Sequence, residues 1–474
     1  MSEKEEINSG TYKIAEHENP LAVERIDRLI AKFAIPAIIS MLVSSLYNIV
    51  DQIFIGRGVG MLGNAATNVA FPVSIICTAT ALLLGIGGAS NFNLESGAGN
   101  QKKASEIAGT SLTLLLICGI VIAVVTFSFL NPLLHLFGVT KQVLPFAQDY
   151  TGITVFGIPF LILTTGGNHL IRADRSPTYS MICMLTGAIL NTILDSLFIF
   201  GFHWGIRGAA WATVIGQVVS GIMVIVYFTK LRKMELTFDM LKPRIRHVKA
   251  IAALGMASCI NQIAMAIVQI TMNNTLRYYG ERSIYGADIP LACVGIISKV
   301  NMVFMAICIG ISQGCQPIWG YNYGAKRYDR VRDTYKLAFQ IAVVVGVVFF
   351  LGFQIFPHSI TALFGDGSEE YFHFAQRYFR IFMFMTFING IQPMSSGFFT
   401  SIRKAVLGAL VSLTRQVIFL LPLIVILPYF MGIDGVMYAG PVADGAAAVV
   451  AITLAVRELK KMEKNRNEQY KREN

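Results

Sequence analysis

Gly205-Ile-Arg-Gly-Ala-Ala-Trp-Ala is the stretch that settles the organisation of this chain, because it returns 227 positions later as Gly432-Ile-Asp-Gly-Val-Met-Tyr-Ala. A second matching pair, Gly99-Asn-Gln-Lys-Lys and Gly324-Ala-Lys-Arg-Tyr, is separated by 225 positions. A nearly constant offset between matching stretches indicates an internal duplication. The sequence therefore predicts two structurally similar halves that meet near the middle of the chain.

The apolar composition places both halves in a membrane. The chain of 474 residues is 54% hydrophobic and only 14% charged, whereas an ordinary soluble domain has about 25% charged residues. Its mean hydropathy is +0.59. Since a spanning helix needs about 20 mostly apolar residues, the sequence predicts an all-α membrane protein with twelve transmembrane helices. We expect them at residues 29–56, 64–94, 104–130, 144–171, 178–202, 207–230, 248–279, 290–321, 334–356, 371–400, 404–430 and 433–457.

The number of helices predicts how the halves are related. Each half has six, an even number, so both halves enter the membrane from the same side and form a parallel repeat. Basic residues gather in particular connecting segments and in the tail, and such residues mark the cytoplasmic side. We therefore expect both termini in the cytoplasm and two six-helix lobes that face each other across a central cavity.

These expectations divide the chain into five parts. Residues 1–28 form a polar cytoplasmic N-terminus, and residues 29–235 form an N-lobe. A basic cytoplasmic linker over 236–247 joins it to a C-lobe over 248–457, and residues 458–474 form a basic cytoplasmic tail. Membrane orientation thus accounts for the formal net charge of +11, and nucleic-acid binding is not expected.

The first half carries carboxylates in otherwise apolar stretches. Asp51 lies near the end of the first predicted helix, and Asp195 lies inside the fifth with Asn191 one helical turn before it. A charged side chain in a bilayer costs about 3 kcal/mol or more, so chains that keep one usually bind an ion, a proton or a substrate with it. Together with Thr213 in the sixth helix, these residues could bind a monovalent cation such as Na+ through oxygens or exchange protons as a coupled pair.

The surroundings of Asp51 leave two interpretations open. Tyr47 and Asn48 precede it by four and three residues and share its helical face. Pro36 removes a backbone hydrogen bond earlier in the helix and permits a bend. Alternatively, Asp51 lies at the outer membrane surface beside Arg57 and is merely solvated.

The second half carries neutral polar residues instead of matching acids. Amides in its first helix are spaced so that they share one face. Such side chains either join helices by hydrogen bonds or line a substrate path together with flexible methionines. The candidates for that path, including those of the first half, are Tyr47, Asn48, Gln217, Gln262, Gln269, Asn273, Met302, Met305, Asn389 and Gln392.

These features resemble the multidrug and toxic compound extrusion (MATE) family, and within it the DinF-like branch and the staphylococcal multidrug exporters. The resemblance is carried by Val50-Asp-Gln-Ile-Phe-Ile-Gly at the end of the first helix and by Asn191-x-x-x-Asp195 in the fifth. The stretch that begins at Gly205 and the run over 309–326 also match. The resemblance covers nearly the whole chain and implies a drug/cation antiporter with a V-shaped, two-lobed fold.

The same resemblance assigns roles to individual residues. Asp51, Asn191, Asp195 and Thr213 match the side chains of the cation site in the N-lobe of DinF-like members. Pro36 matches a first-helix proline tied to bending of that helix. In the NorM-like branch, acids in the seventh and tenth helices matter as well, but here those helices offer amides. A sodium site of the NorM kind in the C-lobe is therefore not expected.

We accordingly expect a secondary active exporter that moves lipophilic, often cationic drugs out of the cell against H+ or Na+ by alternating access. No Walker motif occurs, so we expect neither an ATPase subunit nor a cofactor, and we expect a monomer in the plasma membrane. A rival is a lipid-linked oligosaccharide flippase of the same architecture, which would need several cavity cations, for which only Lys299 and Arg415 are candidates. A remote alternative is an intramembrane enzyme, although no nucleophile with a base and no metal cluster is visible.

Overall fold

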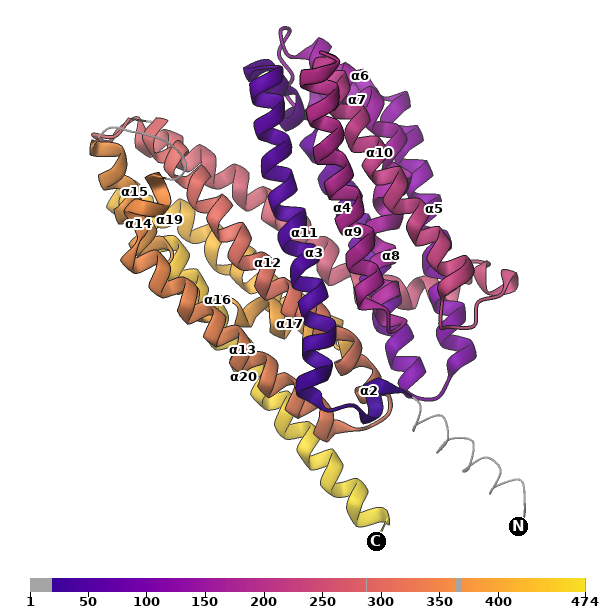
Figure 1. The fold of residues 1–474 in the computed structure, drawn as a ribbon. Helices are drawn as coiled ribbons and strands as arrows, with labels where there is room; N and C mark the ends of the chain where they lie inside the picture. The colour runs from indigo at the N-terminus through magenta and orange to yellow at the C-terminus, as the bar shows by residue number, and fades with distance from the viewer. Residues whose placement is uncertain (1–18, 287, 363–368, 474) are drawn as a thin grey trace.

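The computed structural model describes residues 19–286, 288–362 and 369–473, and this part of the chain is almost entirely helical (Figure 1). No β-strand occurs within those ranges. Most of the predicted N-terminal part lies outside the described residues. Its described end contains α2 (Pro20–Val23), where the Asn19 side chain accepts a hydrogen bond from the Leu21 amide at 3.1 Å.

The first half of the chain forms one bundle of long helices, called here the N-lobe. Short 3-10 and π-helical turns interrupt or extend several of them. Its elements are α3 (Ile26–Gly58), α4 (Met61–Gly97), α5 (Gln101–Ser128), α6 (Leu130–Leu136), α7 (Leu144–Thr154), η1 (Val155–Gly157), α8 (Ile158–Ala173), α9 (Pro177–Asp195), η2 (Ser196–Gly201), α10 (Gly205–Val226) and η3 (Tyr227–Leu231).

A linker with the 3-10 turn η4 (Phe238–Leu241) leads to the second bundle, called here the C-lobe. The linker is held on α5, because the Thr113 hydroxyl donates a hydrogen bond of 2.7 Å to the Leu241 carbonyl oxygen. The elements of the C-lobe are α11 (Ile245–Gly280), α12 (Asp288–Gly324), α13 (Tyr328–Ile355), α14 (Pro357–Ala362), α15 (Glu369–Phe382), α16 (Thr386–Asn389), α17 (Ile391–Ser401), α18 (Ala405–Leu413), η5 (Thr414–Leu420), α19 (Leu421–Met431) and α20 (Ile433–Glu473).

The prediction of an all-α protein with two lobes of spanning helices is confirmed. Eleven helical segments of the described chain are long and apolar enough to cross a membrane. The remaining predicted span, 371–400, is formed by α15, α16 and α17 in succession, and none of the three is long enough alone. Gly390 lies at one of the breaks, and Pro393 occupies the first turn of α17, where its missing N–H has no helical partner to lose.

The two lobes form a V (Figure 1). They meet at the end of the molecule where α2 and the last turns of α20 lie, called here the closed end. They diverge toward the opposite end, called here the open end, where α6 and α14 lie. The principal contacts between the lobes join α3 to α12 and α4 to α11.

Glycines at the closed end let the lobes touch backbone to backbone. A Cβ atom on Gly97 would lie 1.9 Å from the Tyr321 carbonyl oxygen, and one on Gly324 would lie 2.1 Å from the Leu94 carbonyl oxygen. The two contacts are reciprocal, since each of these residues lies 227 positions from its counterpart. This is the geometry of a parallel repeat related by an approximate two-fold axis.

Polar contacts also join the lobes at the closed end. Arg403 of the C-lobe lies 2.8 Å from Glu95 of the N-lobe, and the Asn91 amide donates to the Ala250 carbonyl oxygen at 2.9 Å. Glu95 is also paired with Lys103 at 2.9 Å. The closed end is therefore stabilised by close backbone packing, by ion pairs and by a hydrogen bond between the lobes.

Candidate functional site

The acids singled out in the sequence lie on α3 and α9, two helices that pack together in the N-lobe. Asp51 is 9% exposed, and Asp195 is fully buried. Asp195 is the last residue of α9, after which the chain continues as the π-helical turn η2. Such turns inside helical segments are frequent at functional sites.

The two carboxyl groups meet. The side chains of Asp51 and Asp195 lie close enough to interact directly with each other, and the Oδ1 atom of each is buried without a hydrogen-bond partner among the described residues. Two carboxylates this close repel each other unless a proton or another cation lies between them. Since Asp51 is only 9% exposed, it is not freely solvated beside Arg57, which was the alternative interpretation.

Asn191 and Thr213 complete this group. With the Asn191 amide oriented so that both of its ends are satisfied, its nitrogen donates to Asp195 Oδ2 at 3.1 Å. Its oxygen then accepts from the Thr213 amide at 3.2 Å and the Thr213 hydroxyl at 3.3 Å. The structure thus brings together all four residues predicted for the cation site, which are called here the carboxyl site. The carboxylate, amide and hydroxyl oxygens are hard ligands suited to a small monovalent cation.

Two tyrosines flank the carboxyl site. Tyr47 of α3 is close enough to both carboxyl groups to interact with them electrostatically, as is Tyr150 of α7, which also lies beside Thr213. Tyr47 was expected on the same helical face as Asp51. Tyr150 was missed, because it lies on a different helix and no sequence spacing links it to the acids. A tyrosine at the edge of an apolar span was the only available signal.

An apolar cluster lies between the carboxyl site and the open end. Ile55 follows Asp51 by one helical turn, and Ile199 follows Asp195 by four residues. These isoleucines pack with Ile206, and all three are at most 5% exposed. Side chains of this kind exclude water, so they shield the acids on that side.

The other candidates for a substrate path divide by exposure. Asn48, Gln269, Asn273 and Met302 are exposed, and Gln269 donates to Asn273 at 3.0 Å. Tyr47, Gln217, Gln262 and Met305 are half-buried, and Asn389 and Gln392 are buried. The two buried amides bond within the C-lobe, since Asn389 donates to Asp444 at 3.1 Å and Gln392 to the Val411 carbonyl oxygen at 3.2 Å.

Two buried charged residues of the C-lobe neutralise each other. Arg415 forms an ion pair with Asp444, and both side chains are less than 10% exposed. The guanidinium of Arg415 is therefore compensated inside the lobe and is not a bare cation offered to a pyrophosphate. Lys299 is exposed on α12. The requirement of several cavity cations for an oligosaccharide flippase is thus not met by this pair of candidates.

Pro36 lies where the lobes touch. It is buried inside α3, and the Ser40 hydroxyl donates to its carbonyl oxygen at 2.8 Å. Cβ atoms on Gly310 and Gly314 of α12 would lie 2.6 Å and 2.4 Å from the Cα atoms of Ile38 and Ala34. The proline therefore interrupts the α3 hydrogen-bond ladder at the point of closest approach between α3 and the C-lobe.

A buried arginine on α8 was also missed. Arg172 is 3% exposed, and it donates to Ser180 at 3.1 Å and to Gln313 of the C-lobe at 3.1 Å. It also contacts His169 Nδ1 at 3.0 Å. Arg172 was not singled out from the sequence. The polar residues Asn168, His169 and Arg172 in the last turns of an apolar span were the signal for a buried cluster.

A two-lobed bundle of spanning helices, closed at one end and holding a shielded carboxyl pair in one lobe, defines the class of membrane transporters with two facing bundles. The comparisons with known proteins make the class specific. The MatE family model matches residues 36–197 and 257–426. The chain belongs to this family, the MATE transporters, which confirms the resemblance found in the sequence.

Relatives and solved structures agree with this assignment. The chain is 26% identical over 422 residues to the multidrug export protein MepA of Staphylococcus haemolyticus, covering 89% of this chain and 91% of the relative. It is 25% identical over 423 residues to MepA of Staphylococcus aureus, covering 89% and 92%.

Two solved structures show the same fold. One is an outward-facing multidrug resistance MATE family transporter of the MOP superfamily, with a TM-score of 0.86 at 23% identity over 93% of this chain and 97% of that one. The other is a MATE protein in the straight conformation, with a TM-score of 0.87 at 22% identity over 94% and 98%. Because the chain belongs to the MATE family, the protein is a transporter of the multidrug efflux family and not an enzyme.

Proposed function

We propose that this protein exports lipophilic, often cationic compounds in exchange for a cation that enters through the carboxyl site. The observation that carries the proposal is the contact between Asp51 and Asp195, two acids without a basic partner in the described part of the chain. Two such groups in a sheltered place need a cation to neutralise them. A mobile cation supplies this neutralisation, and its arrival and departure can be linked to transport.

The proximity of the two carboxyl groups supports H+ as the coupling ion. A single proton shared by the pair would remove their mutual repulsion and allow a hydrogen bond between them. The oxygens of Asn191 and Thr213 would equally help to bind Na+, which is the competing choice. In either case, binding of the ion removes the negative charge that attracts a cationic compound, so the ion and the cargo compete.

The driving force is adequate for export. A proton crossing a potential of about 100 mV gains about 2.3 kcal/mol, and one pH unit adds about 1.4 kcal/mol. For a monovalent cationic cargo exchanged one for one, the electrical contributions cancel and about tenfold accumulation per pH unit remains. Two acids allow two ions per cycle, which would restore an electrical contribution.

The V-shaped arrangement supports alternating access. We assign the closed end to the cytoplasm of a plasma-membrane protein, because basic residues gather there, including Lys103 and Arg403 at the lobe contact. The cavity then opens outward. To open inward, the lobes would have to separate the Glu95–Arg403 pair and the glycine contacts at this end.

The remaining parts of the proposal follow from this orientation. Both termini and the linker would be cytoplasmic, with the N-lobe, linker, C-lobe and tail divided as the sequence predicts. In the described part of the chain, α20 continues through the predicted tail to Glu473, so the tail would extend from the membrane as a helix. We propose that one chain suffices for transport, since each lobe supplies half of the cavity.

Efflux from proteoliposomes tests the proposal. The parent protein and Asp195→Asn would be compared with a fluorescent lipophilic cation, while pH and sodium gradients are imposed separately. Asp27→Asn is a matched control, because Asp27 is an exposed acid of the same helix as Asp51 and pairs with Arg25 at 2.9 Å.

The parent and the control should transport at equal rates under one of the two gradients, and Asp195→Asn should lose at least nine-tenths of that gradient-driven rate. Undiminished coupled transport by Asp195→Asn would remove the carboxyl site from the mechanism. A response to sodium but not to pH would replace H+ by Na+ as the coupling ion.

A further inference from the structure

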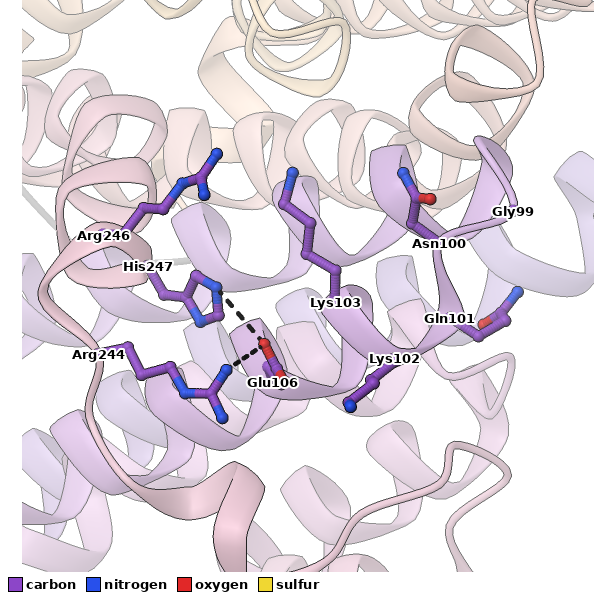
Figure 2. A pocket seen from close by; sticks show the side chains of 9 residues that line it. All are labelled: Gly99, Asn100, Gln101, Lys102, Lys103, Glu106, Arg244, Arg246 and His247. Carbon is purple, nitrogen blue, oxygen red and sulfur yellow. Dashed lines mark ion pairs between the residues drawn. The ribbon is translucent and has the colours of Figure 1, made fainter.

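A basic pocket lies near the closed end, and no residue of the carboxyl site lines it; Figure 2 shows the side chains that do. It has a volume of about 630 Å³ and lies where the first turn of α5 meets the first residues of α11. The residues that matter for its chemistry are Lys102, Lys103, Glu106, Arg244, Arg246 and His247. The pocket thus takes side chains from both lobes.

The pocket carries an excess of positive charge. Its single acid, Glu106, is already paired with Arg244 at 2.7 Å, and Lys103 is paired with Glu95 at 2.9 Å. Lys102 and Arg246 form no ion pair among the described residues, and both are exposed. Two of the pocket cations are therefore available to a ligand.

His247 provides an independent sign of a missing partner. Its side chain is 6% exposed, and its Nε2 atom faces Glu106 Oε2 at 3.8 Å. Its Nδ1 atom is buried without a hydrogen-bond partner in the described part of the chain. Leaving a buried polar atom unpaired costs free energy. The imidazole therefore lines the pocket with hydrogen-bonding capacity that the described residues leave unused.

Two helices also begin at the pocket. Residues Asn100 and Arg244 precede α5 and α11, and neither helix has a side-chain cap at its N-terminus. The first turn of a helix exposes unpaired N–H groups and a partial positive charge, which attract anions. Both helix ends therefore add to the charge of the lysine and arginine side chains.

We propose that this pocket binds a phosphate group, supplied either by the headgroup of an anionic phospholipid or by a soluble phosphate compound. Guanidinium and ammonium groups beside helix N-termini are the usual partners of phosphate oxygens. The proposed phosphate contacts Lys102 of the N-lobe and Arg246 at the start of the C-lobe. Its binding therefore stabilises the contact between the lobes at the closed end.

Ligand-dependent thermal stability of the full chain in a neutral detergent tests this site. The probes are short-chain phosphatidylglycerol, inorganic phosphate and, as a zwitterionic control, phosphatidylcholine, all at constant ionic strength. The parent should be stabilised by phosphatidylglycerol and not by phosphatidylcholine. Stabilisation by inorganic phosphate as well would identify the phosphate alone as sufficient, whereas its absence would identify the lipid headgroup as the source.

Charge-removing variants separate the pocket from general attraction of anions. The double substitution Lys102→Gln and Arg246→Gln should raise the apparent Kd for phosphatidylglycerol at least tenfold. The control, Arg457→Gln and Lys460→Gln, removes two exposed charges of α20 toward the same end and should change it less than twofold. If the double variant is not recovered, Lys102→Gln alone repeats the test.

Three outcomes would overturn the proposal. The parent could be stabilised neither by inorganic phosphate nor by phosphatidylglycerol beyond the effect of phosphatidylcholine, the pocket variant could bind as tightly as the parent, or the α20 control could lose as much affinity as the pocket variant. Because Lys102 and Arg246 form no ion pair, the pocket variant should unfold at the parent temperature without ligand. Any loss of binding is then separable from a loss of folding.

Discussion

Asp444 of the C-lobe and the pair Asp51 and Asp195 of the N-lobe are neutralised in opposite ways. Asp444 is paired with Arg415 and accepts from Asn389. Asp51 and Asp195 lie beside each other and among neutral groups, unlike Glu95 at the closed end of the same lobe, which is paired with Lys103. The C-lobe therefore supplies the counter-charge of Asp444, and the carboxyl site requires one from solution.

The internal duplication makes this difference informative. Asp444 lies 227 positions after Gln217, the spacing of the repeat, and Gln217 is one helical turn beyond Thr213 of the carboxyl site. Related helices of the two lobes thus carry polar clusters in related places. A fixed arginine makes the C-lobe cluster structural, whereas its absence leaves the N-lobe cluster able to exchange a cation.

Removing Asp444 should have the largest effect on stability. Asp444→Asn leaves the buried Arg415 charge uncompensated, so the free energy of unfolding should fall by about 3–5 kcal/mol. The control Asp434→Asn breaks a more exposed pair, with Arg377 at 2.7 Å, and should cost less than about 1 kcal/mol. Denaturant unfolding in mixed micelles measures both. Equal losses would show that the C-lobe pair does not have the structural role assigned to it.

Asp195→Asn should show the reverse pattern. It removes one of two acids that lack a basic partner, so the free energy of unfolding should change by less than about 1 kcal/mol. Coupled efflux should nevertheless fall at least tenfold. Both variants should be measured by unfolding and by coupled efflux, with the efflux of Asp444→Asn measured below its unfolding temperature. A folded Asp444→Asn that loses coupling as strongly as Asp195→Asn would contradict the division of roles between the lobes.

Sequence reasoning reached the fold and the carboxyl site for the same physical reason. Helical periodicity and membrane length are local constraints, so the spans could be read from the chain. Asp195 and Asn191 share a helical face by spacing alone, and an acid in an apolar span is conspicuous. The repeat then supplied the relation between the halves. The transport role of these residues remains a prediction.

Contacts between different helices were less accessible. Tyr150 reaches Thr213 because α7 packs on α10, and no periodicity reports which helices are neighbours. The pairing of Arg415 with Asp444 was missed for the same reason. The division of the predicted span 371–400 into three helices depends on contacts as well, since a Cβ on Gly390 would lie 2.8 Å from Cys308 Sγ.

Single hydroxyl deletions sharpen the N-lobe side of the comparison. Thr213→Val removes the hydroxyl that hydrogen-bonds Asn191, and Tyr150→Phe removes a hydroxyl that lies beside Thr213 and the acids; a hydrogen bond at either place is worth about 1 kcal/mol. Each should therefore weaken the apparent affinity for the coupling ion about fivefold. The control is Thr192→Val on α9, whose hydroxyl bonds only the Ala188 carbonyl oxygen of its own helix, at 2.9 Å.

The ion concentration for half-maximal efflux measures these effects. An unchanged value for both Thr213→Val and Tyr150→Phe would mean that the acids alone define the site. A shift in Thr192→Val as large as in Thr213→Val would indicate a general effect of valine on packing between α9 and α10.

The smallest effect is expected at Asp174, which lies in the turn between α8 and α9. Its surroundings are intermediate between those of Asp444 and those of the carboxyl site. It is buried, and it accepts from the Lys233 amide at 2.7 Å and the Tyr227 hydroxyl at 2.8 Å. Burial raises its pKa above the ordinary 3.8. The folded protein therefore binds this proton more tightly than the unfolded chain does, and stability falls as pH rises from 3.8 through the raised pKa.

Asp174→Asn should flatten that part of the pH profile and add less than about 1 kcal/mol of stability near neutral pH, since the amide oxygen can accept the same two hydrogen bonds. Asp239→Asn has the opposite sign. The Lys242 hydrogen bond lowers the pKa of Asp239, so its contribution is present above the ordinary pKa and is lost as pH falls. Unfolding measured between about pH 2 and pH 8 covers both slopes and distinguishes them. Slopes of the same sign would show that hydrogen bonds, and not burial, control the protonation of Asp174.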